Sequence, residues 1–405
     1  MLDDFGQRIR DIILSEMDLS RELSDEEICD LIGSVVSREA RDRPMTIKDR
    51  AELERTIFNS LRKLDVLQEL VDDRDVTEIM VNGPNDIFYE KAGRIQRFKG
   101  HFSSEEKLED VIQQIVGRHN RVVNQASPIV DTRLSDGSRV NIVLNPISIG
   151  GSAVSIRKFP EHPMSMEGLV EIEALSPEVA RLLQILTQAK YNIFISGGTG
   201  SGKTTFLNAL SQYIPDDERI ITIEDSAELQ LLGAKNIVRL ETRNANTDGV
   251  TPITIRDLIR TALRMRPDRI IVGECRGAEA LDMLQAMNTG HDGSLSTGHA
   301  NSPHDIISRI ETMVLQGQDF PLNAIRQQIA SGIDIIVQLG RLRDKSRRVL
   351  EISEVDGFMD GEIVLHTLYR FEETAVLDSG RIQGFLKKEG TLCHTDKLMA
   401  AGLSV

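Results

Sequence analysis

The stretch NIFISGGTGSGKTT, residues 192–205, decides the fold of this chain of 405 residues. Residues 192–196 have an apolar centre, Ile193 to Ile195, that is typical of a buried strand, and a helix is expected to begin after the glycines and to continue through Leu210. Between them stands the pattern G-x-x-x-x-G-K-[ST], which holds phosphate groups when a strand precedes it and a helix follows. A glycine-rich turn with a chance lysine would not need this full pattern, so we predict a nucleotide-binding loop.

Each residue type in this loop suits one part of a nucleotide. Glycines let consecutive backbone N–H groups turn toward phosphates, and the helix N-terminus adds positive potential. Lys203 would reach the β and γ phosphates, and Thr204 would coordinate Mg²⁺. We therefore expect ATP and Mg²⁺ as cofactors. The candidate nucleotide-binding residues are Gly198, Thr199, Gly200, Ser201, Gly202, Lys203, Thr204 and Thr205.

Two further apolar runs end in acidic residues. RIITIED at residues 219–225 closes on Glu224, and PDRIIVGE at residues 267–274 closes on Glu274. Strands of one sheet would bring these acids to the phosphates. We predict Glu224 as the general base that orients and deprotonates the attacking water, with a solvated strand end as the alternative. Glu274 occupies the Walker B place and is predicted to hold Mg²⁺, directly or through water, together with Thr204.

A glycine-rich segment after the second run carries two histidines. NTGHDGSLSTGHAN at residues 288–301 contains His291 and His299, two of the eight histidines in the chain. A strand and loop at this place would let both side chains hydrogen-bond the γ-phosphate and report its loss. Packing or turn capping is the alternative for each histidine.

The charge balance argues against a protein whose main task is binding nucleic acid. The chain carries 48 basic and 63 acidic residues, a net charge of −15, whereas phosphate backbones are bound by clustered Lys and Arg. Arg256, Arg260 and Arg264 recur every fourth residue on an expected helix, followed by Arg266 and Arg269. A nucleic-acid-binding stripe is one interpretation. A solvated or subunit-facing row of salt bridges is the one we favour.

Cysteine content and hydropathy indicate a reducing, cytoplasmic setting. The cysteines are Cys29, Cys275 and Cys393, whose spacing supports neither a disulfide framework nor a zinc site. The N-terminus lacks the basic start of a signal peptide, and no apolar run approaches the ~18 residues of a membrane-spanning helix. Any membrane attachment is therefore expected to come through partners.

Pattern changes along the chain predict several domains, as expected for this length. Residues 1–60 have helical periodicity and are interpreted as a helical bundle. An α+β domain follows at 61–159, with a hairpin at 76–89, a helix at about 104–118 and strands at 139–144 and 153–159. The prolines of PEHP, residues 160–163, open an extended linker at 160–172. Strands and helices alternate over 173–345, which predicts a parallel sheet flanked by helices, and 346–405 are interpreted as C-terminal strands and a tail.

Taken in order, these motifs resemble those of the type II/type IV secretion (traffic) ATPase superfamily, and most closely its CpaF/TadA branch of tight-adherence (Flp) pilus assembly. The resemblance covers about residues 61–355. Beside the phosphate-binding loop it rests on IEDSAEL (223–229), VGECRG (272–277) and the histidine-containing segment. VTEIMVNGP (76–84) and DTRLSDGSRV (131–140) also look like the N-terminal domain of that branch, which caps the nucleotide in family members.

The resemblance implies an α/β fold with a RecA-like P-loop NTPase core, an N-terminal α+β (PAS-like) domain and an extra N-terminal helical bundle. It further implies a homohexamer that hydrolyses ATP and delivers work to an inner-membrane platform protein in pilus assembly or secretion. Arg139 and Arg157 match positions where family members bring arginines to ATP, with Arg133 as a weaker candidate. Surface salt bridging is the alternative role for these arginines.

Two other functions compete with a motor ATPase. A nucleotide-gated assembly switch would bind ATP and hydrolyse it only incidentally. A nucleic-acid-translocating hexameric ATPase would be supported only by the arginine row, and we expect no stable nucleic-acid partner. An ABC-type ATPase is disfavoured because its signature sequence and Asp-Glu strand ending are missing, and small-metabolite kinases lack the paired acidic and histidine motifs.

Overall fold

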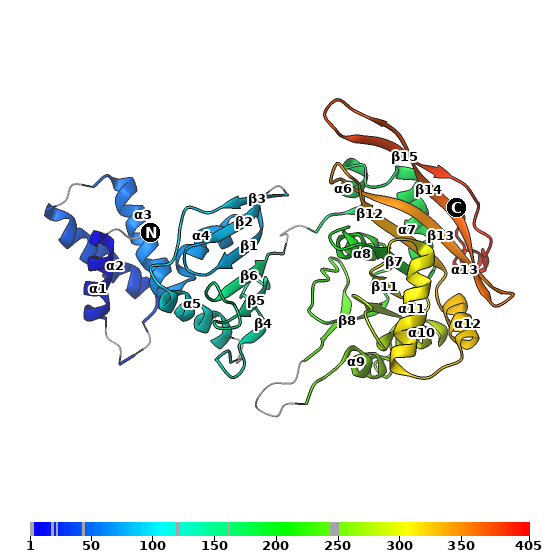
Figure 1. Cartoon of the computed structure of the whole chain (residues 1–405), viewed down its shortest axis with the longest axis horizontal. Helices are drawn as coiled ribbons and strands as arrows, with labels where there is room; N and C mark the ends of the chain where they lie inside the picture. The colour runs from blue at the N-terminus through cyan, green and yellow to red at the C-terminus, as the bar shows by residue number, and fades with distance from the viewer. Residues whose placement is uncertain are drawn as a thin grey trace. The chain divides into compact units, whose positions relative to one another are not determined.

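The computed structural model describes residues 4–17, 20–21, 23–42, 45–91, 93–118, 122–159, 163–243 and 251–405. The chain divides into two compact units, Met1–Glu161 and His162–Val405, which we call unit 1 and unit 2 (Figure 1). Unit 2 alternates strands and helices around a parallel core, so its fold class is α/β, whereas unit 1 combines helices with an antiparallel sheet, which is an α+β arrangement. Of the PEHP segment predicted to break the chain, residues 160–162 lie outside the described residues.

Unit 1 begins with helices. Ser24 and Glu27 form a reciprocal capping box at the start of the second helix, and Thr46 and Asp49 do the same for the third, which satisfies N–H groups that a helix end leaves unpaired. Isoleucines at three- and four-residue spacing meet in one small core. The helical segments are α1 (Asp4–Glu16), α2 (Asp25–Glu39), η1 (Ala40–Asp42), α3 (Ile47–Arg62), η2 (Asp65–Leu67) and α4 (Gln68–Asp72).

The rest of unit 1 is a six-stranded antiparallel sheet with one long helix, α5 (Glu105–Gly117). The strand order is β3-β2-β1-β6-β5-β4. The hairpin predicted at 76–89 is confirmed as β1 and β2. The strands are β1 (Val76–Asn82), β2 (Ile87–Lys91), β3 (Arg94–Arg97), β4 (Ile129–Arg133), β5 (Arg139–Val143) and β6 (Ala153–Arg157).

Three arginines stand side by side across this sheet. Arg133 is the register partner of Arg139, which is in turn the register partner of Arg157. Glu78 on β1 pairs with Arg157 from the other side. Register partners point to the same face, and like charges directly opposite each other are destabilising without acidic groups or an anion nearby. The sheet therefore carries a concentrated positive row at one end of β4, β5 and β6.

Unit 2 is built on a nine-stranded mixed sheet in the order β15-β14-β13-β12-β7-β11-β10-β8-β9. The six strands from β12 to β9 are parallel, which confirms the predicted parallel sheet. Central strands such as Ile193–Gly197 are buried on both faces. The strands are β7 (Ile193–Gly197), β8 (Arg219–Glu224), β9 (Asn236–Glu241), β10 (Arg269–Val272), β11 (Leu295–Gly298), β12 (Ile335–Arg341), β13 (Arg347–Met359), β14 (Glu362–Val376) and β15 (Ile382–Lys388).

Helices cover both faces of this sheet (Figure 1). One core contains apolar side chains of α6, α7 and α8, and the other contains those of α9 to α12. Ser176 caps α7 and Pro177 is its first residue, as predicted. The helices are α6 (Met166–Glu171), α7 (Pro177–Gln188), α8 (Lys203–Ser211), α9 (Ile255–Ala262), α10 (Glu279–Asn288), α11 (Pro303–Gly317), α12 (Leu322–Gly332) and α13 (Asp396–Ala401).

One segment differs from its prediction. The predicted linker 160–172 is not extended throughout, because Ser165 caps the short helix α6 and Met166 and Leu169 enter the core of unit 2. The segment 346–405, interpreted as strands and a tail, contains the strands β13, β14 and β15, which continue the sheet beyond β12 as an antiparallel meander.

Residues 389–398 then return to the sheet, and we call this segment the C-terminal strap. Glu354 is 1% exposed, and its two carboxylate oxygens accept the backbone N–H groups of Cys393 at 2.7 Å and His394 at 2.8 Å. Lys397 Nζ lies 2.6 Å from Asp334 and 2.8 Å from Asp292, both beside strand starts. The strap is therefore tied to the edge of the sheet where the parallel strands begin, which we call the amino edge.

A buried ion pair also lies at the amino edge. Arg269, the first residue of β10, is fully buried and its guanidinium contacts the carboxylate of Glu218. Its Nη1 also donates to the carbonyl oxygens of Thr187 at 2.8 Å and Gly293 at 3.2 Å. The contacts of Arg269 join four separate segments of unit 2.

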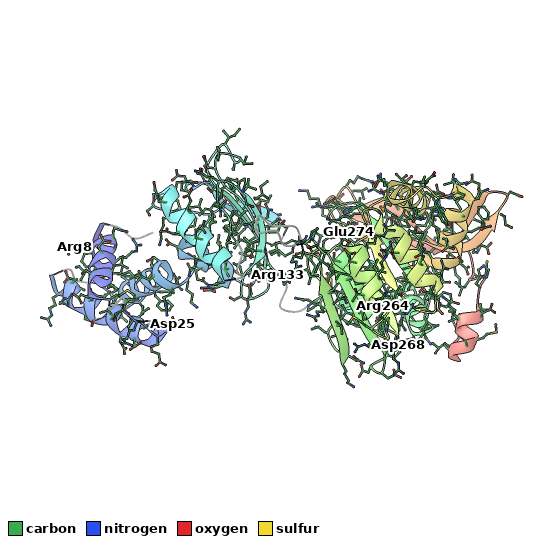
Figure 2. All side chains as sticks on the ribbon, turned by 90° about the horizontal axis from the view of Figure 1, so that it is seen from below. Arg8, Asp25, Arg133, Arg264, Asp268 and Glu274 are labelled. Atoms are coloured by element: carbon green, nitrogen blue, oxygen red, sulfur yellow. The ribbon has the colours of Figure 1, made fainter. Side chains whose placement is uncertain are left out.

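Replacing Arg269 is expected to destabilise the fold strongly. Removing one partner of a buried pair leaves an uncompensated charge, which costs about 3–5 kcal/mol. The Arg269→Met variant should lose that much unfolding free energy in urea titrations followed by far-ultraviolet circular dichroism. Arg264→Ala, at an exposed position labelled in Figure 2, is the matched control and should change stability by less than about 0.5 kcal/mol. A loss below about 1 kcal/mol for Arg269→Met would contradict this prediction.

The predicted arginine row is broken up in the structure. Helix α9 ends at Ala262, so Arg264 lies beyond it. Arg256 Nε and Arg260 Nε contact the two oxygens of Asp282 on α10, at 2.7 and 3.1 Å. Arg256 and Arg260 thus form salt bridges within the chain, in line with the favoured interpretation as salt-bridging residues, while Arg264 is not part of the helix.

Candidate functional site

The predicted phosphate-binding loop connects β7 to α8. Gly200 has φ +71° and Gly202 has φ +95°, left-handed values that favour glycine. A Cβ on Gly198 or Gly200 would meet no atom within 4 Å, so the space over the loop is open. The first turn of α8 leaves its N–H groups unpaired, as every helix start does. These features fit a bound phosphate, and they involve the predicted binding residues Gly198 to Thr205.

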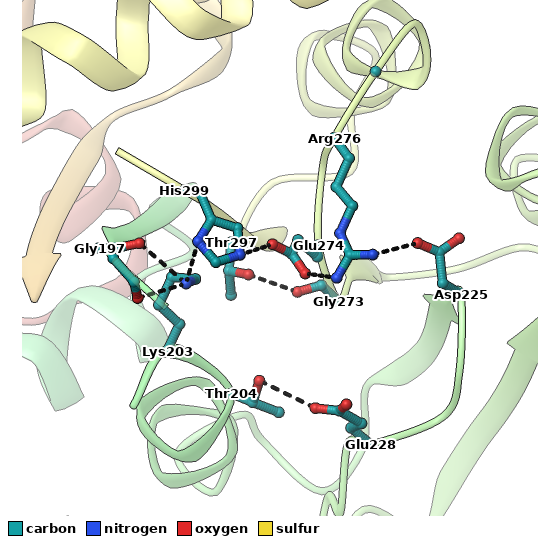
Figure 3. A network of polar contacts seen from close by, with 12 residues as sticks. Gly197, Lys203, Thr204, Asp225, Glu228, Gly273, Glu274, Arg276, Thr297 and His299 are labelled. Carbon is teal, nitrogen blue, oxygen red and sulfur yellow. Dashed lines mark hydrogen bonds and ion pairs between the residues drawn. The ribbon is translucent and has the colours of Figure 1, made fainter. Parts of the chain in front are cut away.

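Lys203, the first residue of α8, points into the loop. Its Nζ donates to the carbonyl oxygens of Gly197 at 3.0 Å and Gly198 at 3.1 Å, and it lies 3.3 Å from Nδ1 of His299 (Figure 3). Burial lowers the pKa of this ammonium group. These contacts therefore hold the positively charged ammonium group of Lys203 in place beside the phosphate-binding loop.

His299 connects the loop to the neighbouring acid. Its Nε2 lies 2.6 Å from Oε1 of Glu274. Because Lys203 can only donate, Nδ1 must accept and Nε2 must carry the proton, so the hydrogen-bond network assigns the tautomer. Burial, and then the charge of Lys203, lower the pKa of His299, which agrees with a neutral ring.

Glu274 is positioned by the strands on both sides of it. The N–H of Gly273 donates to Ile223 of β8, and that of Cys275 donates to Thr297 of β11, both at 2.9 Å. Oε2 of Glu274 is bound by Arg276, whose other nitrogen lies 3.6 Å from Asp225 (Figure 3).

The hydrogen bond to Glu274 raises the pKa of Arg276. Lys203, His299, Glu274, Arg276 and Asp225 form a continuous polar chain, which we call the acid–histidine network. It crosses the edge of the sheet where the parallel strands end, which we call the carboxyl edge.

Glu224 is brought to the same edge, but its own loop engages it. It is 4% exposed, and Oε2 accepts the backbone N–H groups of Glu228 at 2.6 Å and Leu229 at 2.9 Å. A Cβ on Gly273 would lie 2.8 Å from Cγ of Glu224, so this glycine makes room for the acid. The carboxylate of Glu228 contacts the start of α8, because Thr204 Oγ1 donates to its Oε2 at 3.5 Å.

The oxygen atoms at the carboxyl edge suit a Mg²⁺ ion that substrate phosphates also bind. They do not form a metal site made of protein side chains alone. No group of three or more His, Cys, Asp or Glu side chains that could hold a metal occurs among the described residues. Mg²⁺ usually takes one or two protein carboxylates, with substrate phosphates and water completing its shell. The Thr204 hydroxyl and the Glu228 carboxylate fit that pattern, whereas both oxygens of Glu274 already contact His299 and Arg276.

The structure does not bring His291 into the network. His291 precedes β11 and so lies at the amino edge, where its Nδ1 is 3.2 Å from the carbonyl oxygen of Ala286 near the end of α10. This contact matches the turn-capping alternative, because a strand separates His291 from His299. Arg139 and Arg157 lie in unit 1, and their part in the site stays a prediction.

Sequence reasoning missed two arginines at this site. Arg276 follows Glu274 by two residues, and that proximity in a motif was the available signal. Arg347 belongs to the charged run at 343–348, and its Nε donates to the carbonyl oxygen of Gly200 at 2.9 Å. No local pattern indicates that contact, because 147 residues separate its partners.

A membrane-spanning helix needs about 20 mostly apolar residues, and the described segments contain no helix that qualifies.

The fold is similar to that of the pilus retraction motor PilT crystallised with bound ADP, with a TM-score of 0.54 and 23% identity over 76% of this chain and 82% of that chain. The ATPase DotB of Yersinia pseudotuberculosis is also similar, with a TM-score of 0.53 and 20% identity over 72% of this chain and 78% of that one.

Sequence comparison extends the likeness to most of the chain. Conjugal transfer protein TrbB of Rhizobium radiobacter is 31% identical over 81% of this chain and 98% of its own length. Type IV secretion system protein PtlH of Bordetella pertussis is 33% identical over 73% of this chain and 94% of its own length. The model of the type II/IV secretion system protein family matches residues 60–382. The chain therefore belongs to the type II/IV secretion system protein family.

Proposed function

We propose that this protein is an ATP-hydrolysing motor of a secretion or pilus-assembly system. The observation that carries the proposal is the acid–histidine network, which connects the phosphate-binding lysine to acids on two neighbouring strands. Hydrolysis of a phosphoanhydride needs a cation at the phosphates, a carboxylate for water and a metal ligand close together. Membership of the type II/IV secretion family supports secretion as the setting.

In this proposal each side chain has a separate role. Lys203 binds the β and γ phosphates, and Thr204 binds Mg²⁺, which would neutralise phosphate charge when bound. Glu224 acts as the general base, and Glu274 supports the metal side of the site through its contacts with His299 and Arg276. The Nδ1 atom of His299 faces Lys203, so His299 is placed to respond when the terminal phosphate leaves. Glu228 is the alternative carboxylate for the catalytic roles given to Glu224 and Glu274.

The proposal includes the arrangement of the chain and its partners. Residues 173–345 form a RecA-like ATPase core, residues 61–159 an N-terminal PAS-like domain, and residues 1–60 an additional helical bundle. Six copies assemble, and the hexamer acts in the cytoplasm on an inner-membrane platform protein, as in the CpaF/TadA (Flp) branch. The order of motifs in the sequence supports this branch.

The test is Mg²⁺-dependent ATP turnover by the purified chain, measured with and without the platform protein. A motor should hydrolyse ATP steadily and faster when the platform protein is present, and chelation of Mg²⁺ should stop it. A nucleotide-gated switch would instead bind ATP with negligible turnover in both conditions, which would rule out the motor.

A further prediction concerns the arginine row of unit 1. Arginines that approach ATP from a second domain or subunit contribute about 10³–10⁵ to turnover in other nucleotide hydrolases. The in-register row of Arg133, Arg139 and Arg157 supplies such a concentration of charge. We expect the Arg139→Ala/Arg157→Ala double variant to bind ATP and to assemble, but to hydrolyse at least about 100-fold more slowly. Arg157→Ala alone should also hydrolyse slowly and fail to close the N-terminal domain over the nucleotide.

Two arginines of the opposite edge strand provide the control. Arg94 and Arg97 lie on β3, at the far side of the same sheet from β4. Their double alanine variant should keep wild-type turnover. Sedimentation and calorimetry report assembly and ATP affinity for each variant. Wild-type turnover by the assembled Arg139→Ala/Arg157→Ala protein would remove both residues from the site.

A further inference from the structure

Helix α11 begins four residues after His299, which directly follows β11, and its two faces have different characters. Ile306, Ile310 and Met313 are buried in the core of unit 2. The opposite face repeats polar residues at helical spacing, with Ser308, Arg309 and Thr312 exposed. Ser302 caps the helix start and Pro303 is its first residue, which fixes where this polar face begins.

A cavity of about 560 Å³ lies between this face and the phosphate-binding loop. Gly198 and Thr199 line it from the loop, His299 lines it from the strand end, and Arg309 lines it from α11. All of these residues belong to unit 2. The cavity therefore continues the phosphate-binding loop on the side where the Lys203 ammonium meets His299.

Unlike Arg276 and Arg347 at this edge, Arg309 has no side-chain partner among the described residues. Arg276 contacts Glu274, and Arg347 contacts Gly200. Within the described residues, no hydrogen bond or ion pair involves the side chain of Arg309, although Asp305 lies one turn earlier on the same helix. The charge of Arg309 is close enough to contribute to the lowered pKa of His299, after burial and the nearer cations. The Arg309 guanidinium on the cavity wall is thus available to bind an anion.

We propose that Arg309 binds the terminal phosphate of ATP and so makes the site selective for a triphosphate over a diphosphate. The inference deepens the proposed function and rests on it. Lys203 serves both the β and the γ phosphate, so ADP retains much of that interaction. In this proposal the guanidinium, on the cavity wall opposite the loop, contacts the group that extends beyond the β-phosphate. Arginine suits this role because its planar donors match phosphate oxygens in pairs.

The test compares nucleotide affinities, and activity is not its readout. Calorimetry would measure binding of ADP and of a non-hydrolysable ATP analogue, both with Mg²⁺, to the wild-type protein, Arg309→Ala, Arg309→Lys and the control Arg264→Ala. Arg264 precedes β10 and lies near the amino edge, away from the cavity. Arg309→Ala should bind the analogue about 10- to 100-fold more weakly while ADP affinity stays within about 2-fold, because a charge-assisted hydrogen bond is lost.

The remaining outcomes separate this inference from the proposed function. Arg309→Lys should recover part of the analogue affinity, since it restores charge without the planar donors. Equal losses for ADP and the analogue, or no loss for either, would overturn the inference and leave the nucleotide site in place. A change confined to oligomeric state, seen by sedimentation, would assign Arg309 to a contact between copies instead. A wild-type protein that binds neither nucleotide would overturn the proposed function and the inference together.

Discussion

The Lys203→Ala variant is expected to lose ATP binding while keeping its fold. The ammonium group is held at the loop by two carbonyl oxygens and His299, so it is already oriented toward the place where phosphates would bind. Its removal deletes the only charge that the loop itself supplies to the β and γ phosphates. Hydrogen bonds to charged groups contribute about 1.5–3 kcal/mol each, so two such bonds correspond to a loss of about 100-fold or more in affinity.

Calorimetry with ATP and Mg²⁺ measures this loss directly. Lys235→Ala is the matched control, because Lys235 is exposed on the same unit and pairs only with Asp216 among the described residues. The control should bind like the wild-type protein, and both variants should retain wild-type circular dichroism. Near-wild-type ATP affinity in Lys203→Ala would count decisively against the nucleotide site.

Glu224→Gln and Glu274→Gln are each expected to keep ATP binding and to lose turnover. A general base contributes about 10²–10⁴ to a rate, and the amide that replaces the Glu224 carboxylate would lack the basic oxygen. At position 274 the amide would turn a donor toward Arg276 or His299, where two donors already require an acceptor. We expect at least about a 100-fold fall in kcat for each variant, with ATP affinity changed by less than about 5-fold.

Steady-state turnover and calorimetry on the same preparations separate chemistry from binding. Glu362→Gln is a suitable control, since Glu362 is exposed at the start of β14 and contacts Arg326. Wild-type turnover by both site variants would assign the chemistry to other acids. Glu228, beside Thr204, would be tested next, followed by Asp225.

Local patterns allowed the sequence to predict the parallel core and much of the carboxyl edge. The phosphate-binding loop is a continuous motif, and Glu224 and Glu274 each end an apolar run, so their place at strand ends follows from the residues beside them. His291 shows that closeness in the sequence does not guarantee a place in the same site. It stands in the same glycine-rich segment as His299, yet β11 lies between them and places them at opposite edges of the sheet.

Local sequence patterns did not predict contacts between residues that are distant in the sequence. Arg269 looked like one more member of an arginine row, and its burial depends on Glu218, Thr187 and Gly293, which are distant in sequence. The strands after β12 do not alternate regularly between buried and exposed residues. Much of β13 is buried on both faces, and the end of β14 is mostly exposed. Neither pattern predicts how these strands extend the sheet.

The C-terminal strap has a mechanical consequence. It ties residues 393–397 to the buried Glu354 and to Asp334 at the amino edge, while the nucleotide site lies at the carboxyl edge of the same sheet. Buried carboxylates that lose their donors cost free energy, so the strapped edge resists deformation. In the proposed motor, we therefore expect phosphate release to move the loops of the acid–histidine network relative to an amino edge that stays fixed.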